Sequence, residues 1–219
     1  VEAVIHKALN YWFTAKPVCL NWWYNQIGIP KTLGTVFILF EKQLTPVEKQ
    51  NAITVMENAK FGMTGQNKVW LAGNVMMRAL LQNDYELVKM ARDTIASEIV
   101  TGGAEGIKDD WCFHQHGAQQ QFGNYGLSFV SGMSFFSGLF SGTSLAFDDK
   151  QLSILSTLID KGYRWVIWKG MMDVNALGRQ LFHHAPVHKA LSLAFAASEL
   201  GGGESDECVA VATALLRDN

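Results

Sequence analysis

The spacing of hydrophobic residues indicates helices from one end of the chain to the other. In residues 1–15 the hydrophobic side chains recur every three or four positions, which would place them on one face of a helix. The same pattern predicts helices over residues 30–44, 67–82, 84–100, 125–141, 148–168, 187–200 and 205–217, and Thr45-Pro46-Val47-Glu48 is a capping box that starts another. No segment alternates as a half-buried strand would. We therefore predict an all-α fold of eight or nine helices without a sheet.

The connections between the predicted helices are of two kinds that roughly alternate. Some are short and plain, whereas the segments 16–30, 61–67, 102–125 and 169–186 are long and rich in aromatic, amide and histidine side chains. If helical hairpins stack side by side, the rich loops gather at one end of the assembly. This arrangement predicts a cleft on one face of the helices.

Composition narrows the class of protein. Of the 219 residues 48 % are apolar and 17 % are charged, which is below the usual charged share of roughly 25 % and indicates a well-packed core rather than disorder. The formal net charge of −2 argues against a nucleic-acid partner. No uninterrupted apolar run of about 18 residues predicts a membrane span. We expect the three cysteines, Cys19, Cys112 and Cys208, to be unpaired thiols.

Several residues in the rich loops could bind a ligand or carry chemistry. Trp22 and Trp23 precede a helix and could form a stacking wall for sugar rings; alternatively, one is buried and the other partly exposed. Asn67 could cap a helix or donate a hydrogen bond to a ligand carboxylate. Arg179 could be a surface arginine or could hold a phenolate or carboxylate.

Two histidines in the densest polar segment allow two interpretations. His114 and His116 are two positions apart, so on an extended chain they face the same way and could bind a metal together with His183, His184, His188 or an aspartate. Alternatively, a histidine of this segment and Tyr125 meet at a junction between a loop and a helix and act as an acid–base pair. An HxH pair without a further motif is weak evidence for a metal.

Taken together, four blocks of the sequence resemble polysaccharide lyase family 8, which includes chondroitin AC, hyaluronate and xanthan lyases. The blocks are NWW…IGIPKTLG at 21–34, TGxNK at 64–68, DDWCFHQHGAQQQFGNYG at 109–126 and GR at 178–179. Their order and spacing match over nearly the whole chain. Tyr125 follows His116 by nine positions, as in the chondroitin AC, hyaluronate and xanthan type, whereas the chondroitin ABC type has a shorter spacing.

The resemblance implies both a fold and an activity. The fold is an incomplete (α/α) toroid of helical hairpins, with residues 1–219 as one helical catalytic domain. The activity is β-elimination in a 1,4-linked glycosaminoglycan that contains uronic acid, chondroitin sulfate or hyaluronan, to give a 4,5-unsaturated uronate, with no metal or other cofactor. The implied catalytic residues are Asn67, His116, Tyr125 and Arg179, and the implied substrate-binding residues are Trp22, Trp23 and His183.

The resemblance also implies a role for each catalytic residue. Asn67 and His116 stabilise the charge that develops at the uronate carboxylate. Tyr125 takes the proton from C5 and then protonates the leaving oxygen, helped by the positive charge of Arg179. Alternatively, His116 is the base and Tyr125 only the acid, and the sequence leaves both assignments open.

The sequence departs from the family pattern in two ways. The family's downstream β-sandwich domains and some helices that precede its NWW block are missing, so we expect a fragment of a larger enzyme whose catalytic glutamate comes from beyond residue 219. His183 stands where the family often has a second arginine, four residues after the first. The alternatives are therefore a glycan-binding helical module without turnover, a xanthan-lyase type of activity, and a metal-dependent hydrolase that uses His114 and His116. For a polymeric substrate we expect the enzyme to be secreted or periplasmic.

Overall fold

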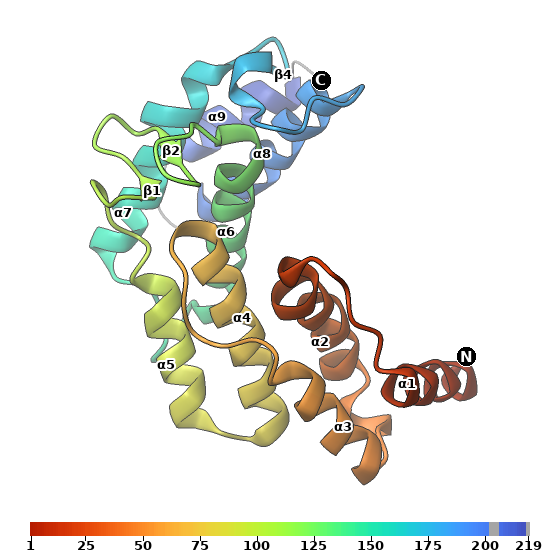
Figure 1. Cartoon of the computed structure of the whole chain (residues 1–219). Coiled ribbons are helices and arrows are strands. Elements are labelled where there is room, and N and C mark those ends of the chain that lie inside the picture. Colours follow the sequence, from red (N-terminus) through yellow and green to blue (C-terminus); the bar gives the residue numbers. More distant parts are fainter. Residues whose placement is uncertain (202–205, 218–219) are drawn as a thin grey trace. The chain divides into compact units, whose positions relative to one another are not determined.

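Helices dominate the computed structural model, which describes residues 1–201 and 206–217 (Figure 1). The α-helices are α1 (Glu2–Ala15), α2 (Ile29–Leu39), α3 (Pro46–Met56), α4 (Gly65–Gln82), α5 (Tyr85–Ala96), α6 (Leu127–Phe140), α7 (Asp149–Thr157), α8 (Ala185–Gly201) and α9 (Asp206–Arg217). Single π-helical turns occupy Tyr24–Gly28, Phe122–Gly126 and Leu158–Gly162, and 3₁₀ turns occupy Glu41–Gln43, Tyr163–Val166 and Val174–Ala176. The predicted all-α class is confirmed.

Two very small sheets depart from the prediction. Strand β1 (Gly106–Ile107) pairs antiparallel with β2 (Phe113–His114), and β3 (Ile167–Trp168) pairs antiparallel with β4 (Met171–Met172). Each strand has only two residues, which is too short to produce a recognisable alternation of hydrophobic and polar side chains.

The single helix predicted for residues 148–168 is also wrong in its second half. Helix α7 ends at Thr157, and a π-helical turn, a 3₁₀ turn and strand β3 follow. Gly162 lies where the chain leaves the helical path, and a Cβ at this position would collide with the backbone oxygen of Trp111. Glycine is also a poor helix former. The glycine at position 162 therefore explains both the close approach to Trp111 and the end of the helical path.

By their internal contacts, the residues fall into two compact units. Unit 1 comprises residues 1–63 and 67–95, and unit 2 comprises residues 64–66 and 96–219. The assignment of residues 1–219 to one catalytic domain remains a prediction from the resemblance.

The core of unit 1 joins α1, α2, α3 and α4. Its fully packed members are Leu9, Phe13, Phe37, Ala52, Met56 and Leu81. Helix α2 can approach its neighbours because a Cβ at Gly34 would lie only 2.7 Å from Cε of Met56 and 2.9 Å from Cε of Met77. The predicted capping box is present: Thr45 Oγ1 accepts from the Glu48 amide at 3.2 Å, and the Glu48 carboxylate accepts from the Thr45 amide at 2.9 Å.

In unit 2, helix α8 packs against both α6 and α9. Ser134 on α6 donates a hydrogen bond of 2.6 Å to the backbone oxygen of Ala196 on α8. Tyr163 is completely buried, and its hydroxyl donates to the backbone oxygen of Phe122 at 3.1 Å. Burial raises the pKa of Tyr163 well above its usual value, so this hydroxyl is a neutral structural donor.

Two expectations about the chain as a whole can be compared with the structure. The three cysteines all lie in the described part of the chain and none forms a disulfide, as expected. No described helix combines the length and the hydrophobicity that a membrane span requires.

Candidate functional site

The candidate site is centred on the phenolic oxygen of Tyr125. Tyr125 lies in the π-helical turn Phe122–Gly126, which leads directly into α6. Only 7 % of the residue is exposed, so its ring is held by packing while the hydroxyl meets two polar side chains. The predicted position of Tyr125 at a junction between a loop and a helix is therefore correct.

The first of these polar partners is His116. Its Nε2 lies 3.0 Å from Oη of Tyr125, and the two rings meet edge to face, with their centroids 5.0 Å apart. The tautomer of the imidazole decides which group donates. An unprotonated Nε2 would accept the phenolic proton, and a protonated Nε2 would donate to the phenolic oxygen.

The second partner is Arg179, which comes from a distant part of the sequence. Its Nη2 donates a hydrogen bond of 3.2 Å to Oη of Tyr125, and its guanidinium carbon lies 5.8 Å from the centre of the tyrosine ring. A guanidinium has donors but no acceptor. Because Arg179 occupies an acceptor position of the phenolic oxygen, the proton of Tyr125 can be directed toward His116, or a phenolate can accept from both neighbours.

Glycines make this close arrangement possible. A Cβ at Gly123 would lie 2.8 Å from the backbone Cα of Leu177, so the Tyr125 turn can meet the segment before Arg179 only with glycine at position 123. Gly178 has a φ of +65°, a left-handed conformation that glycine adopts without strain. A Cβ at Gly178 would lie 2.5 Å from Oε1 of Gln121.

A buried lysine, which the sequence analysis did not single out, supports the same region. Lys189 on α8 is 7 % exposed, and its Nζ donates to the backbone oxygen of Gly123 and, at 2.5 Å, to Oε1 of Gln180. Burial lowers the pKa of Lys189. A signal for this residue was present in the sequence, because Lys189 interrupts the otherwise apolar face formed by Leu193, Ala196 and Ala197.

Asn67 belongs to unit 1 and is described with that unit. Helix α4 begins at Gly65, so Asn67 lies inside the first turn, and the alternative prediction that it caps the helix is wrong. It is buried, and within the described part of the chain its Oδ1 makes no hydrogen bond. A buried polar atom without a hydrogen-bond partner costs folding free energy. Many side chains that bind a ligand have such an atom.

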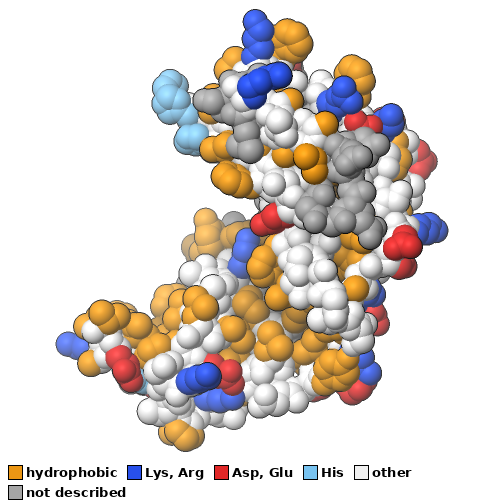
Figure 2. All heavy atoms as spheres, turned by 180° about the vertical axis from the view of Figure 1, so that it is seen from behind, with side chains coloured by type: hydrophobic (Ala, Val, Ile, Leu, Met, Phe, Trp, Pro, Cys, Tyr) orange, Lys and Arg blue, Asp and Glu red, His pale blue; other side chains and the backbone are white. Residues whose placement is uncertain are grey.

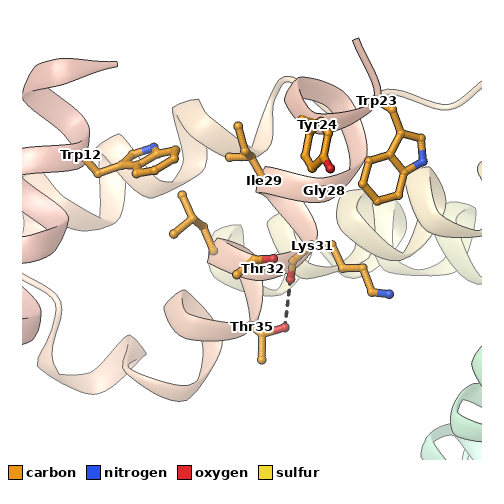
Figure 3. Close-up of a pocket in the computed structure, with 9 residues that line it drawn as sticks. Trp12, Trp23, Tyr24, Gly28, Ile29, Lys31, Thr32 and Thr35 are labelled. Carbon is orange, nitrogen blue, oxygen red and sulfur yellow. Dashed lines mark hydrogen bonds between the residues drawn. The ribbon is translucent and has the colours of Figure 1, made fainter. Parts of the chain in front are cut away.

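The two adjacent tryptophans differ in their surroundings. Trp22 is 42 % exposed. Trp23 is half-buried and packs edge to face on Tyr24 and on Trp70, with ring centroids 5.3 and 5.5 Å away. Trp23 and Tyr24 line an open pocket of about 680 Å³ in unit 1, together with Trp12 of α1 and residues of α2 (Figure 3).

This pocket has a mixed lining. Figure 3 shows Trp12 on one side and Tyr24 and Trp23 on the other, with Ile29 between them and the Lys31 side chain extending below Trp23 in this view. The ammonium group of Lys31 lies 5.5 Å from the ring centre of Trp70, and burial lowers the pKa of Lys31. Aromatic faces beside a cation suit an acidic sugar.

His183 lies in the loop between the last 3₁₀ turn and α8. Its ring centroid is 3.8 Å from that of His184, and both side chains are exposed. Figure 2 shows histidine side chains projecting from the surface of unit 2. In the described part of the chain, the aromatic contact of His183 is with His184, and its predicted contact with substrate remains a prediction.

The histidines do not gather into a metal-ligand cluster in the part of the chain described. Among the side chains that the structure describes, those of residues 1–200, 208–214 and 217, no group of three or more from His, Cys, Asp and Glu is placed to hold a metal ion. His116 is directed instead at Tyr125, which is the acid–base alternative from the sequence.

Comparisons with known proteins identify the family to which the chain is similar. A model of the N-terminal α-helical domain of polysaccharide lyase family 8 matches residues 1–198. Chondroitinase-AC of Pedobacter heparinus is 31 % identical over 180 residues, which make up 80 % of this chain and 26 % of that protein. Xanthan lyase of Bacillus sp. strain GL1 is 27 % identical over 178 residues, or 78 % of this chain and 19 % of that protein.

Solved structures show the same fold. A structure of chondroitinase AC lyase studied in complexes with oligosaccharides superposes with a TM-score of 0.83 at 26 % identity, covering 98 % of this chain and 33 % of that one. A Paenibacillus xanthan lyase superposes with a TM-score of 0.84 at 24 % identity, covering 99 % of this chain and 21 % of that one. The expected fold class, an all-α fragment of an (α/α) toroid, is confirmed.

The chain spans only about a quarter of chondroitinase-AC and a fifth of the xanthan lyase. Its similarity to these proteins is nevertheless continuous over most of its own length. Because the family model covers residues 1–198 of 219, the chain belongs to polysaccharide lyase family 8.

Proposed function

We propose that the protein containing this chain cleaves a 1,4-linked glycosaminoglycan with uronic acid residues, chondroitin sulfate or hyaluronan, by β-elimination. The observation that carries the proposal is the placement of Tyr125 Oη within hydrogen-bond distance of both His116 Nε2 and Arg179 Nη2. This arrangement can take up a proton from a carbon acid and give it back to a leaving oxygen. The names of two of its relatives, chondroitinase-AC and hyaluronate lyase, support chondroitin sulfate and hyaluronan as the candidate substrates.

The reaction balances without a cofactor. A base removes the proton from C5 of the uronate, the C5–H electron pair forms the C4=C5 double bond, and the bond from C4 to the glycosidic oxygen breaks. The leaving oxygen then takes a proton. Tyr125 serves both steps if it enters as the phenolate and leaves the first step protonated, so its hydroxyl can protonate the leaving oxygen in the second.

The neighbours of Tyr125 would stabilise the negative charge that develops during the reaction. Arg179 stabilises negative charge on the phenolic oxygen through its charge-assisted hydrogen bond. In the transition state the substrate carboxylate gains further negative charge, and the side chains of Asn67 and His116 would donate to it. His116 remains the competing candidate for the base, with Tyr125 then acting only as the acid.

Trp22, Trp23 and His183 would contact the polysaccharide outside the reacting bond. The faces of tryptophan rings bind the apolar faces of sugars, and the exposed Trp22 and the pocket beside Trp23 offer such faces. His183 stands where a second arginine is common in the family. We therefore propose that it contributes to substrate choice.

A direct assay tests the activity. The full-length protein is incubated in parallel with chondroitin sulfate, hyaluronan and xanthan, and the ultraviolet absorbance of the unsaturated uronate is followed. We expect absorbance to rise with chondroitin sulfate or hyaluronan. A rise with xanthan alone would assign the xanthan-lyase type instead, and binding without any rise would indicate a glycan-binding module.

We also propose that the enzyme works outside the cytoplasm, secreted or in the periplasm, together with downstream β-sandwich domains of the same polypeptide. The reason is physical, since a long anionic polysaccharide does not cross a membrane intact. The full-length gene product provides the test: it should begin with a secretion signal, and a start without one would contradict this proposal.

A further inference from the structure

His116 has a backbone conformation that is unfavourable for a residue with a side chain. Its φ is +59°, and the φ of the following Gly117 is +75°. In the left-handed region the Cβ of a non-glycine residue comes too close to the following carbonyl oxygen, so the conformation is unfavourable. His116 is also exposed, so burial of its own side chain does not fix the loop. Other contacts have to hold it.

A single carboxylate, that of Glu105, holds the chain on both sides of His116. Glu105 Oε1 accepts a hydrogen bond of 2.9 Å from the backbone amide of Gly117, and Glu105 Oε2 accepts from Nε2 of Gln115. Hydrogen bonds to an ionised acceptor are about twice as strong as those between neutral groups. Both sequence neighbours of His116 are thereby tied to one side chain.

The Glu105 carboxylate and its partner Gln115 are themselves held by further hydrogen bonds within unit 2. Gln115 is only 1 % exposed, and its Oε1 accepts from the backbone amide of Gln66 at 2.9 Å. Thr64 Oγ1 donates to Glu105 Oε2 at 2.5 Å. Gly65 lies against the same amide: a Cβ there would collide with Oε1 of Gln115, and its φ of +57° also favours glycine. The carboxylate therefore belongs to a fixed network and not to a mobile surface chain.

The backbone of Glu105 is fixed as well. The next residue, Gly106, pairs in the β1–β2 hairpin with His114. Glu105 and the His116 loop are consequently attached to the two strands of one small sheet. A carboxylate in this position bonds to the residues on either side of His116.

From these contacts we infer that Glu105 is a positioning residue, which holds the imidazole of His116 against the hydroxyl of Tyr125. The inference rests on the proposed lyase function. Glu105 acts on elimination only through His116. Its loss should therefore lower turnover more than it weakens substrate binding.

The first test replaces Glu105 by glutamine in the full-length protein, with Glu199→Gln on the exposed face of α8 as the matched control. An amide nitrogen cannot accept, so in E105Q one of the donors on the carboxylate faces an NH₂ group. We expect kcat to fall at least about tenfold with KM within about twofold, whereas E199Q stays at the wild-type values. If E105Q does not fold, E105D takes its place in the test. Aspartate keeps the negative charge, but its side chain is one methylene shorter, so the carboxylate is withdrawn from the same donors.

A double mutant separates positioning from general destabilisation. In a His116→Ala background, adding E105Q should leave the residual turnover unchanged within about twofold, because the residue that Glu105 positions is already gone. An equal loss of turnover in both backgrounds would overturn the inference.

A spectroscopic measurement keeps the inference separate from the proposed function. In the full-length protein labelled at histidine ¹³Cε1, the His116 resonance, assigned with H116A, should move in E105Q and stay in place in E199Q. This holds even if no polysaccharide is cleaved, in which case the lyase proposal fails and the inference about Glu105 survives. An unmoved His116 resonance in E105Q would refute the positioning role whether or not the protein is a lyase.

Discussion

The ammonium group of Lys189 donates a hydrogen bond to the backbone oxygen of Gly123, two residues before Tyr125. Its second hydrogen bond goes to Gln180, the residue after Arg179. One buried cation on α8 thus joins the two segments that supply the phenolic oxygen and the guanidinium. The separation of Tyr125 and Arg179 depends on this link as well as on their own hydrogen bond.

Replacing Lys189 by methionine should therefore lower both stability and turnover. The change leaves the buried backbone oxygen of Gly123 and the side-chain oxygen of the exposed Gln180 without their donor, and we expect a loss of about 1–3 kcal/mol in the free energy of unfolding, mainly from the buried oxygen. A shift of about 1 Å between Tyr125 and Arg179 would reduce kcat up to about 100-fold. Denaturant unfolding and the elimination assay measure the two effects. Lys150→Met, at an exposed lysine, should change neither, and wild-type values for K189M would show that the link is dispensable.

The hydroxyl of Tyr125 is expected to carry the proton. Tyr125→Phe keeps the packed ring and removes only the oxygen that meets His116 and Arg179. Turnover of the full-length protein should fall by about two to four orders of magnitude, the usual range for loss of a general acid–base group. Substrate affinity should change little. Tyr11→Phe, at an exposed tyrosine of α1, is the matched control.

Two outcomes would reassign the chemistry. If Tyr125→Phe retains turnover and His116→Ala abolishes it, His116 is the base and the tyrosine has a minor role. If both variants retain turnover, the lyase proposal itself is wrong. These variants separate the roles that the sequence left open, because each removes a single proton-carrying group.

The central residues of the site could be predicted because they lie in recognisable local patterns. His116, Tyr125 and Arg179 stand in two sequence blocks that resemble a known family, and the structure brings all three together. The supports behind them could not be predicted in the same way. Lys189 stands out in the sequence as a lysine on an apolar helix face, but its partner Gly123 is 66 positions away, and the choice of that partner depends on how α8 packs.

The same distinction between local patterns and tertiary contacts applies to the fold. Helices with a regular hydrophobic face were predicted within a few residues, including the capping box at Thr45. The prediction was wrong after Thr157, because the path of the chain there depends on the approach of Gly162 to Trp111. Such an approach is a tertiary contact, and the periodicity of residues 148–168 does not contain it.

The two adjacent tryptophans should respond differently to alanine. Trp22→Ala removes an exposed ring, so we expect KM to rise about threefold to tenfold at nearly constant kcat, in line with about 0.5–1.5 kcal/mol for an aromatic contact. Trp23→Ala also removes the packing on Trp70 and should lower the thermal midpoint as well. Kinetics and thermal unfolding distinguish the two. An unchanged KM in both variants would exclude the aromatic wall from substrate binding.

The most buried carboxylate of unit 1 should make the stability of this unit depend on pH. Glu48 is 2 % exposed and accepts from His6 Nδ1 at 2.9 Å and from Asn10 Nδ2 at 3.1 Å, so it joins α3 to α1. Burial raises the pKa of Glu48, but the hydrogen bonds from Thr45 and His6 and the charge of His6 outweigh it, and the net pKa is lowered.

A carboxyl group whose pKa is lower in the folded than in the unfolded chain stabilises the fold above its unfolded pKa, and this contribution is lost as the pH falls through the folded value. The free energy of unfolding should therefore decline as the pH falls below about 4.5, the ordinary value for this carboxyl.

In Glu48→Gln that part of the decline should be absent, and stability at pH 7 should be lower by about 1–3 kcal/mol, because the donors of α1 lose a charged acceptor. Denaturant unfolding from pH 3 to pH 7 measures both effects. Glu57→Gln, at an exposed carboxyl near the end of α3, should keep the wild-type curve. If E48Q followed the wild-type acid decline, the loss of stability would have to come from other carboxyl groups.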